Sequence, residues 1–370
     1  MMKDNPLKAL EMLGQSIWLD YIRRDLIASG ELRRLIGEDG LRGMTSNPSI
    51  FEEAIAESEI YDKDIHDLAK KKKDVKAIYE MLSQRDVQNA ADEFRTVYDK
   101  TDGKDGYVSL EVNPHLAHDT KGTIEEVHRL WIALKRPNVL IKVPATIEGL
   151  PAIRQLISDG INVNVTLLFG IPRYRQVIKA YIDGIRDRTD HGKPVKNIVS
   201  VASFFLSRID TLIDPKEEEF VALGGEQAHF ATKIRGQVAI SSAKIAYKIY
   251  KETFESEHFL ELGASPQRLL WASTSRKNPD YSDIKYVEAL IGPNTVNTVP
   301  LETLEAYRDH GTPSPQLEVN VEQASLVMSE LTEVGIDIKK ITRKLENQGV
   351  KKFIKSFDKL MDALTKKSSE

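Results

Sequence analysis

The sequence predicts a (β/α)8 barrel, the TIM-barrel fold, with additional helices. Short apolar runs alternate with longer stretches of helical periodicity along the 370 residues, and eight such runs are present. Eight strands separated by helices match the order of elements in this fold. An open doubly wound sheet is the alternative. However, neither G-x-G-x-x-G nor G-x-x-x-x-G-K-[ST] follows any run, which argues against a dinucleotide or P-loop site.

The predicted strands are apolar runs bounded by turn-forming or charged residues. Each has the length and composition of a strand buried on both faces in a parallel sheet. The second run is the weakest of the set because it contains several polar residues. In chain order the runs cover residues 16–20, 41–47, 107–112, 139–146, 161–169, 198–206, 268–274 and 295–300.

The stretches between the strands predict helices with recognisable ends. Asn47 is a typical N-cap before Pro48, the Gly- and Asp-rich residues 99–106 form a turn, and Gly160 ends a helix. The main predicted helices cover residues 21–37, 49–72, 74–98, 121–136, 148–159, 172–185, 226–254 and 336–365. We expect one barrel domain over residues 1–370, with extra helical segments near residues 50–100 and 310–370.

Composition argues against several classes of function. The 52 basic and 56 acidic residues leave a net charge of −4, and the basic run at 70–73 has no interleaved aromatic residues, so nucleic acid is not an expected partner. Because the chain has no cysteine, disulfides and thiolate metal sites are excluded. No apolar run has the roughly 18 residues of a membrane helix. Residues 1–13 lack the apolar core of a signal peptide. We therefore expect a cytoplasmic protein.

One lysine interrupts the most apolar of the predicted strands, residues 139–146 (VLIKVPAT). Lysine is almost never fully buried unless another group pairs with it or a reaction uses it. Loss of hydration disfavours the charged form of the amine. Lys142 is therefore a candidate nucleophile that forms a Schiff base with a carbonyl substrate. A purely structural ion pair with a nearby carboxylate is the alternative interpretation.

Two carboxylates stand near the carboxyl ends of other predicted strands, where the βα loops of a barrel build active sites. Glu111 lies on the strand next to that of Lys142, so it can transfer protons while water leaves the lysine adduct, directly or through a water held by Thr166. Asp20 is a separate base that can deprotonate a substrate hydroxyl, so that a carbon–carbon bond breaks. The alternatives are a helix cap for Asp20 and an ion-pair partner of Lys142 for Glu111.

The remaining polar residues suit the hydroxyls and the phosphate of a sugar phosphate. Asn47 and Asn164 can bind hydroxyls, although Asn47 is also explained as a helix cap. Arg208 and Arg276, each of which a surface position would also explain, suit a phosphate. A hydroxyl cluster adjoins Arg276, formed by Ser273, Thr274 and Ser275, of which we assign Thr274 to the site. Together these residues predict Schiff-base aldol chemistry on a phosphorylated sugar, without a metal or other cofactor.

Several segments of the sequence resemble transaldolase. They are TSNPSI (45–50), SLEVNP (109–114), IKVPAT (141–146), GINVNVTLLF (160–169) and SFFLSRID (203–210), within a resemblance that runs from about residue 14 to 310. The resemblance implies a (β/α)8 barrel that transfers a dihydroxyacetone unit between sugar phosphates of the non-oxidative pentose phosphate pathway. The implied donors are fructose 6-phosphate and sedoheptulose 7-phosphate, and the implied acceptors are glyceraldehyde 3-phosphate and erythrose 4-phosphate. The chain is most similar to the longer bacterial form.

The same resemblance implies roles for individual residues. By motif, Lys142 takes the Schiff-base position, Glu111 that of the proton-transfer carboxylate and Asp20 that of the base that cleaves the carbon–carbon bond. The residues that match substrate-, water- and phosphate-binding positions are Asn47, Asn164, Thr166, Ser203, Arg208 and Arg276. Either a monomer or a homodimer is expected.

Three other functions are alternatives to this one. Fructose-6-phosphate aldolases resemble transaldolase but are shorter, and they carry glutamine where Glu111 stands and tyrosine where Phe205 stands. A barrel that binds sugar phosphate without covalent chemistry, as a sensor or an isomerase, would trap no adduct with borohydride. A metal-dependent aldolase would use His115, His118 and His128, but the first two stand in a loop with no evident third ligand.

The last predicted helix, residues 336–365, is strongly basic. Its lysines at 351, 352, 355 and 359 are interpreted as a solvated face. Packing of this helix over the mouth of the barrel is the alternative.

Overall fold

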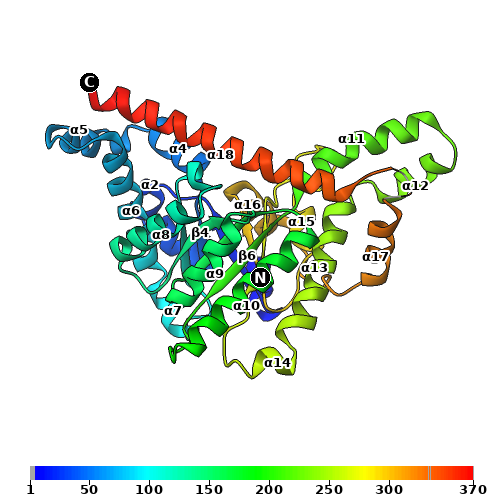
Figure 1. Cartoon of the computed structure of the whole chain (residues 1–370). Helices are drawn as coiled ribbons and strands as arrows, with labels where there is room; N and C mark the ends of the chain where they lie inside the picture. Colours follow the sequence, from blue (N-terminus) through cyan, green and yellow to red (C-terminus); the bar gives the residue numbers. More distant parts are fainter. Residues whose placement is uncertain (1–4, 332, 334, 370) are drawn as a thin grey trace.

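The computed structural model describes residues 5–331, 333 and 335–369, and within them eight parallel strands close into a barrel (Figure 1). Each strand pairs with the next, and the last pairs with the first, so the strand order is that of the chain. The strands are β1 (Gln15–Asp20), β2 (Gly43–Thr45), β3 (Tyr107–Glu111), β4 (Val139–Pro144), β5 (Val163–Leu168), β6 (Ser200–Phe205), β7 (Arg268–Ala272) and β8 (Thr295–Val299). The predicted fold class is confirmed, and every predicted strand is present.

Helices follow each strand and surround the barrel. Ahead of β1 lies α1 (Pro6–Met12). The helices after β1 to β4 are α2 (Arg24–Ala28), α3 (Glu31–Glu38), α4 (Pro48–Ala56), η1 (Glu59–Tyr61), α5 (Asp62–Lys70), α6 (Val75–Glu93), α7 (Arg95–Lys100), η2 (Pro114–Leu116), α8 (Thr120–Leu134) and α9 (Gly149–Asp159). Those after β5 to β8 are α10 (Ile171–Asp190), α11 (Ser207–Leu223), α12 (Glu226–Ile234), α13 (Val238–Phe254), α14 (Glu257–Leu260), α15 (Lys285–Glu288), α16 (Leu301–His310), α17 (Val321–Glu330) and α18 (Ile338–Ser369).

Some predicted helices are divided in the structure, and a long helix, α11, was missed, as were the short helices α1, α14 and α15. The predicted helix 21–37 is split into α2 and α3 at Gly30, which has a φ of 83° and so cannot continue a helix. Helix α11 follows β6 but was not among the predicted helices. It contains Pro215, a residue that normally interrupts a helical pattern because it lacks a backbone N–H.

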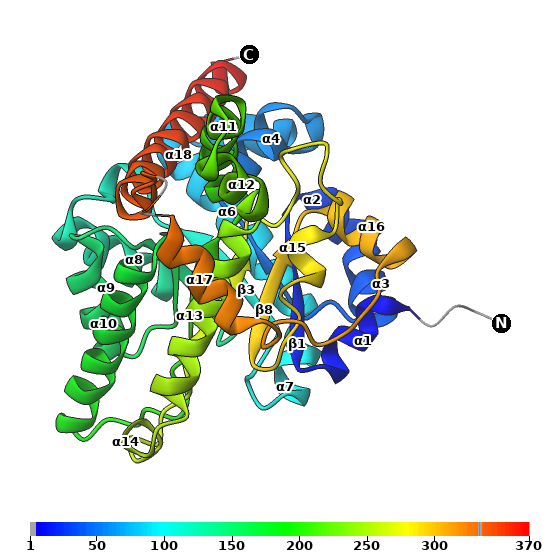
Figure 2. The same cartoon turned by 90° about the vertical axis from the view of Figure 1, so that its right-hand side faces the viewer.

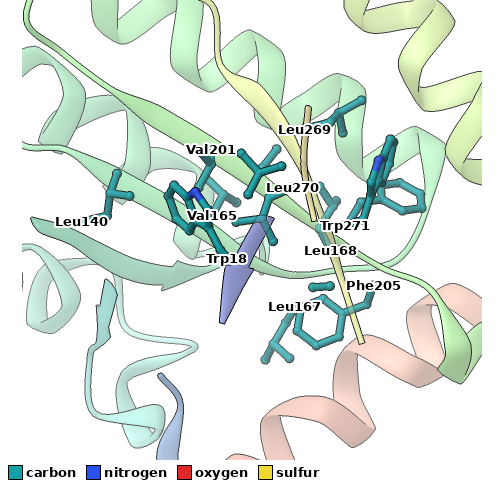
Figure 3. Packing of buried hydrophobic residues seen from close by; sticks show 14 of the residues in the cluster. Trp18, Leu140, Val165, Leu167, Leu168, Val201, Phe205, Leu269, Leu270 and Trp271 are labelled. Atoms are coloured by element: carbon teal, nitrogen blue, oxygen red, sulfur yellow. The ribbon is translucent and has the colours of Figure 1, made fainter. Parts of the chain in front are cut away.

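The interior of the barrel is filled with side chains toward the amino ends of the strands. Trp18 is buried there and its indole donates a hydrogen bond to Asp105 at 3.2 Å. Gly43 on the next strand leaves room for the indole, since a Cβ at this position would lie 2.6 Å from the ring. Arg268 binds the same carboxylate at 3.2 Å and closes this end with a buried ion pair. Figure 3 shows how densely apolar side chains of β1 and β4 to β7 pack.

The last helix crosses the opposite end of the barrel, where the strands have their carboxyl ends (Figures 1 and 2). Helix α18 packs against α4 and η2, and it also contacts β5 and α11. On its inner face Phe353, Phe357 and Leu360 are buried. The lysines at 351, 352, 355 and 359 are exposed, as predicted for a solvated face. The helix as a whole nevertheless lies over the mouth of the barrel, which was the alternative prediction (Figure 1). The barrel therefore has its polar end covered by one long helix.

In the part of the chain that the structure describes, no helix is long and apolar enough to cross a membrane.

Candidate active site

The sheet register sets three polar side chains side by side. Glu111 on β3 pairs with Lys142 on β4, and Lys142 pairs with Asn164 on β5. Lys142 is 4% exposed. Its Nζ donates a hydrogen bond of 3.0 Å to the carbonyl oxygen of Ser46 and lies 3.5 Å from Oε2 of Glu111. The lysine is thus a buried amine with a carboxyl group beside it, as the sequence predicted.

The carboxyl group of Glu111 is buried in surroundings that favour its neutral form. Apart from the Lys142 ammonium, the described residues offer its two oxygens no hydrogen-bond donor. Burial raises the pKa of Glu111 to about 7, and the positive charge of Lys142 opposes the rise only in part. A carboxyl group that titrates near neutrality can both give and accept a proton at physiological pH.

The second carboxylate, Asp20, ends β1 and lines the same cavity. It accepts a hydrogen bond of 2.7 Å from the Thr45 hydroxyl, which is 2.8 Å from the hydroxyl of Thr298. Burial raises the pKa of Asp20, while Lys142 and the Thr45 hydrogen bond oppose the rise. The side chain of Asp20 is therefore oriented by Thr45 of β2, whose hydroxyl is in turn bonded to Thr298 of β8.

A chain of hydrogen bonds runs from Asn164 to β3 and β6. The amide of Asn164 donates to the Ser109 hydroxyl at 3.0 Å, and its oxygen accepts from the Ser203 hydroxyl at 2.6 Å. Thr166, one inward position further along β5, is buried, and its hydroxyl has no hydrogen-bond partner among the described residues. A buried hydroxyl in this state is suited to hold a water molecule.

A cavity of about 500 Å³ opens at the carboxyl end of the barrel. This volume lies in the range of small-ligand sites. Of the predicted site residues, those that line the cavity are Asp20, Asn47, Lys142, Ser203, Arg208 and Thr274. Glu111, Asn164 and Thr166 lie behind the lining, in the strands on either side of Lys142. All the predicted site residues except Arg276 therefore lie around one cavity.

Asn47 is the predicted helix cap and also lies at the cavity, where hydroxyl binding stays a prediction. Its side-chain oxygen caps α4 by accepting from the backbone N–H groups of Ser49 at 3.0 Å and Ile50 at 3.1 Å. The same residue lines the cavity. Because the cap uses only the oxygen, the amide N–H groups are available to the cavity.

Cationic residues gather at one side of the cavity, but not all are those predicted. Arg208, at the start of α11, is half-buried, its Nε has no hydrogen-bond partner in the described chain, and burial lowers its pKa. Lys277, which was not predicted, also lines the cavity and donates to the Ser275 hydroxyl at 2.6 Å. Arg276 is exposed and is not among the lining residues. Its guanidinium donates to two carbonyl oxygens of its own loop, at 3.3 Å and 3.1 Å.

Helix α18 supplies two lining residues: Lys352, which was predicted to lie on a solvated face, and Phe353, which was not named among the candidates. Their position on an amphipathic helix far along the chain carries no signal that they reach a cavity. Lys277 had a weak signal, because it directly follows the residue that was chosen, Arg276.

The three histidines considered for a metal site have separate partners. His115 lies 2.7 Å from Asp358, His118 lies 3.0 Å from Glu148, and a third carboxylate, Asp159, lies 2.9 Å from His128. Within the described residues, no group of three or more potential ligands is arranged to hold a metal ion.

A (β/α)8 barrel with a buried lysine, an adjacent carboxyl group that titrates near neutrality and cations at the cavity rim defines an aldolase-type enzyme. Residues 17–364 match the family model described as transaldolase/fructose-6-phosphate aldolase, and the chain belongs to this family. The match extends beyond the predicted resemblance and includes most of α18.

Named relatives match over nearly the whole chain. A "Transaldolase" of Trichodesmium erythraeum is 48% identical, with 99% of this chain and 98% of the relative covered. A "Transaldolase" of Thiobacillus denitrificans is 46% identical, with 96% and 99% covered. A "Transaldolase" of Mycolicibacterium smegmatis is 44% identical, with 98% and 97% covered.

Proposed function

We infer that this protein is a transaldolase, which transfers a dihydroxyacetone unit from a ketose phosphate to an aldose phosphate. The donors are fructose 6-phosphate and sedoheptulose 7-phosphate, and the acceptors are erythrose 4-phosphate and glyceraldehyde 3-phosphate. The observation that best supports this function is the buried pair of Lys142 and Glu111. Their Nζ and Oε2 atoms are 3.5 Å apart, and Lys142 lines the cavity. Full-length relatives named transaldolase support it.

The first half of the reaction forms the covalent adduct. The neutral amine of Lys142 attacks the ketose carbonyl carbon, and a proton passes from the nitrogen to the carbonyl oxygen, which becomes a hydroxyl. Glu111 in its protonated form gives a proton to this hydroxyl, water leaves, and the nitrogen and carbon share a double bond. A water on the unpartnered Thr166 hydroxyl can carry the proton, because Thr166 stands two positions from the strand partner of Lys142.

The second half exchanges the aldose. Asp20 takes the proton of the hydroxyl on the far carbon of the bond that breaks, that carbon leaves as the aldehyde of the product, and the electrons of the bond pass into the iminium to give an enamine. The enamine then attacks the carbonyl carbon of the acceptor, and Asp20 returns its proton to the new hydroxyl. Ser203 lines the cavity and donates a hydrogen bond from its hydroxyl to Asn164, so Asn164 orients Ser203 and leaves the Ser203 oxygen to accept a hydrogen bond from a substrate hydroxyl. Water finally hydrolyses the iminium and frees Lys142.

The phosphate of the substrate lies at the cationic side of the cavity. We assign its binding to Arg208 and Lys277, since both line the cavity. Thr274 keeps its hydroxyl bonded to the carbonyl oxygen of Thr298 at 2.8 Å and so shapes the wall. Arg276 supports phosphate binding indirectly, because its hydrogen bonds to backbone carbonyl oxygens fix the loop that contains Lys277.

The test combines product analysis with trapping. With fructose 6-phosphate and erythrose 4-phosphate, we expect formation of sedoheptulose 7-phosphate. Borohydride added with fructose 6-phosphate alone should attach the reduced three-carbon unit to the peptide that contains Lys142. Lys142→Ala should abolish both signals. Activity that survives in Lys142→Ala, with unchanged protein mass, would overturn the Schiff-base assignment.

A second buried lysine offers a matched control within the same protein. The ammonium of Lys244 donates to the carbonyl oxygens of Gln316 and Val319, and burial lowers its pKa. It is not among the cavity-lining residues. If burial alone made a lysine reactive, its peptide would be labelled as well; we expect label only at Lys142.

A simple fructose-6-phosphate aldolase is the competing function within the family. It would release free dihydroxyacetone at the same rate with or without erythrose 4-phosphate. We expect release to be slow without the acceptor. The proposal is compatible with a monomer and with a homodimer. A cytoplasmic location fits these substrates and the lack of cysteine.

A further inference from the structure

Helix α18 is seated on the barrel by contacts on both sides of the cavity. At Gly349 it meets the tip of Leu167, and a Cβ on this glycine would lie 2.9 Å from that side chain. Glu346 pairs with Arg173 at 3.2 Å on the α10 side. Ser356 shares a hydrogen bond of 2.8 Å with Ser49 on the α4 side. The turn between these anchors, residues 350–355, therefore has a defined position over the cavity.

That turn presents one charged and one apolar residue to the cavity, Lys352 and Phe353. Phe353 is 5% exposed and belongs to the core, so the backbone of its neighbour is fixed. Lys352 is exposed, as are other lysines of the basic face such as Lys351 and Lys355, but those two are not among the lining residues. Lys352 thus differs from them by position, although all are lysines of the same helix.

We propose that Lys352 is a substrate-binding residue: its ammonium, together with Arg208 and Lys277, binds the phosphate of the sugar phosphate. The C-terminal helix would then contribute directly to donor affinity. The proposal rests on the proposed function, because it requires a phosphorylated substrate in this cavity.

The electrostatics of the cavity favour an anion beside these cations. Burial lowers the pKa of Lys277 and the neighbouring Arg208 lowers it further, while Glu302 and Asp20 oppose the shift in part. Burial also lowers the pKa of Lys352, and both Arg208 and Lys277 add to this effect. The fold therefore holds three cations that repel one another at the lining of one cavity. A phosphate dianion placed among them relieves this repulsion and gains charge-assisted hydrogen bonds.

The acidic group that acts on Lys352 is already engaged elsewhere. Glu52 on α4 raises the pKa of Lys352 slightly, but its carboxylate lies 3.3 Å from Lys359, another lysine of α18. Glu52 therefore pairs with Lys359, and the charge of Lys352 is available to a ligand in the cavity.

The experiment compares Lys352→Met with Lys355→Met, a matched control on the exposed side of α18. For Lys352→Met we expect the KM for fructose 6-phosphate to rise about tenfold, as for the loss of one hydrogen bond to a charged group. The inhibition constant of inorganic phosphate should rise by a similar factor, while kcat changes by less than about twofold. Lys355→Met should leave all three quantities unchanged.

Two further measurements separate phosphate binding from a structural role. Borohydride trapping with dihydroxyacetone, which has no phosphate, should be equal in Lys352→Met and the unmodified protein. Lys352→Arg, which keeps the charge, should restore the KM and the phosphate inhibition. In Lys277→Met, a second substitution of Lys352 should raise the KM by less than it does alone, because the two cations share one ligand.

The outcomes distinguish the proposal from the function on which it rests. An unchanged KM and phosphate inhibition in Lys352→Met would overturn the proposal and leave the function intact. A fall in kcat with unchanged KM, or equal losses with dihydroxyacetone and fructose 6-phosphate, would overturn it as well, by showing that α18 acts through structure. Failure of the unmodified protein to form sedoheptulose 7-phosphate would instead refute the proposed function.

Discussion

The proton chemistry of the site depends on how one carboxyl group is buried. Glu111 has a pKa raised to about 7, and the proposed mechanism uses its protonated form when water leaves the adduct. We expect the rate of Schiff-base formation, measured by borohydride quenching, to fall as pH rises through about 7. Glu111→Gln should lower the rate and remove this inflection. An inflection that persists in the variant would mean that another group supplies the proton.

The same titration affects folding stability, with a sign that follows from linkage. The pKa of Glu111 is higher in the folded protein than the ordinary value of 4.5, so between pH 4.5 and about 7 the folded state binds more protons. The free energy of unfolding then falls as pH rises through this window, by up to about 3 kcal/mol for a shift of this size. Glu111→Gln should remove this contribution. Denaturant unfolding of both proteins at pH 5 and pH 8 measures the difference.

At the scale of elements, the seat of α18 depends on a close contact between a glycine and a strained residue. The pairing of β5 is irregular between Val165 and Leu168, and Leu167 in this irregularity has a φ of 54°. Figure 3 shows Leu167 beside Phe205 at this end of the barrel. Gly349 of α18 fits over Leu167 because it has no side chain.

Gly349→Leu tests this contact with an unambiguous sign. Leucine raises intrinsic helix propensity by nearly 1 kcal/mol relative to glycine, so any loosening must come from the clash. The clash should cost about 1–3 kcal/mol. We expect hydrogen exchange of α18 amides to accelerate while the strands stay protected, and Leu167→Ala in the same chain to restore protection. Equal acceleration throughout the barrel would argue against a local seat.

At the scale of the whole molecule, we propose a single folding domain. One connected apolar core runs from Leu7 in α1 to Leu364 in α18 and includes residues of every strand. We therefore expect one calorimetric transition with equal calorimetric and van't Hoff enthalpies. Two separable transitions, or a stable barrel that unfolds after α18, would divide the chain into two units.

The sequence predicted the features that depend on local pattern. The strands were recognisable because they are buried on both faces. Lys142, Glu111 and Asp20 were recognisable because charged residues are out of place in such strands. Lys277 and Lys352 could not be predicted in this way, since a lysine on a loop or an amphipathic helix has the same local pattern whether it meets solvent or a cavity. The course of α18 depends on contacts with β5 and α4, more than a hundred residues away in the chain.

The position of α18 also has a consequence for the order of biosynthesis. Every strand of the barrel precedes residue 300, whereas Lys352 and Phe353 lie near the end of the chain. During synthesis the strands that carry Lys142 and its neighbours therefore leave the ribosome before α18 does. The part of the cavity wall formed by Lys352 and Phe353 can join the strands only after α18 has emerged as well.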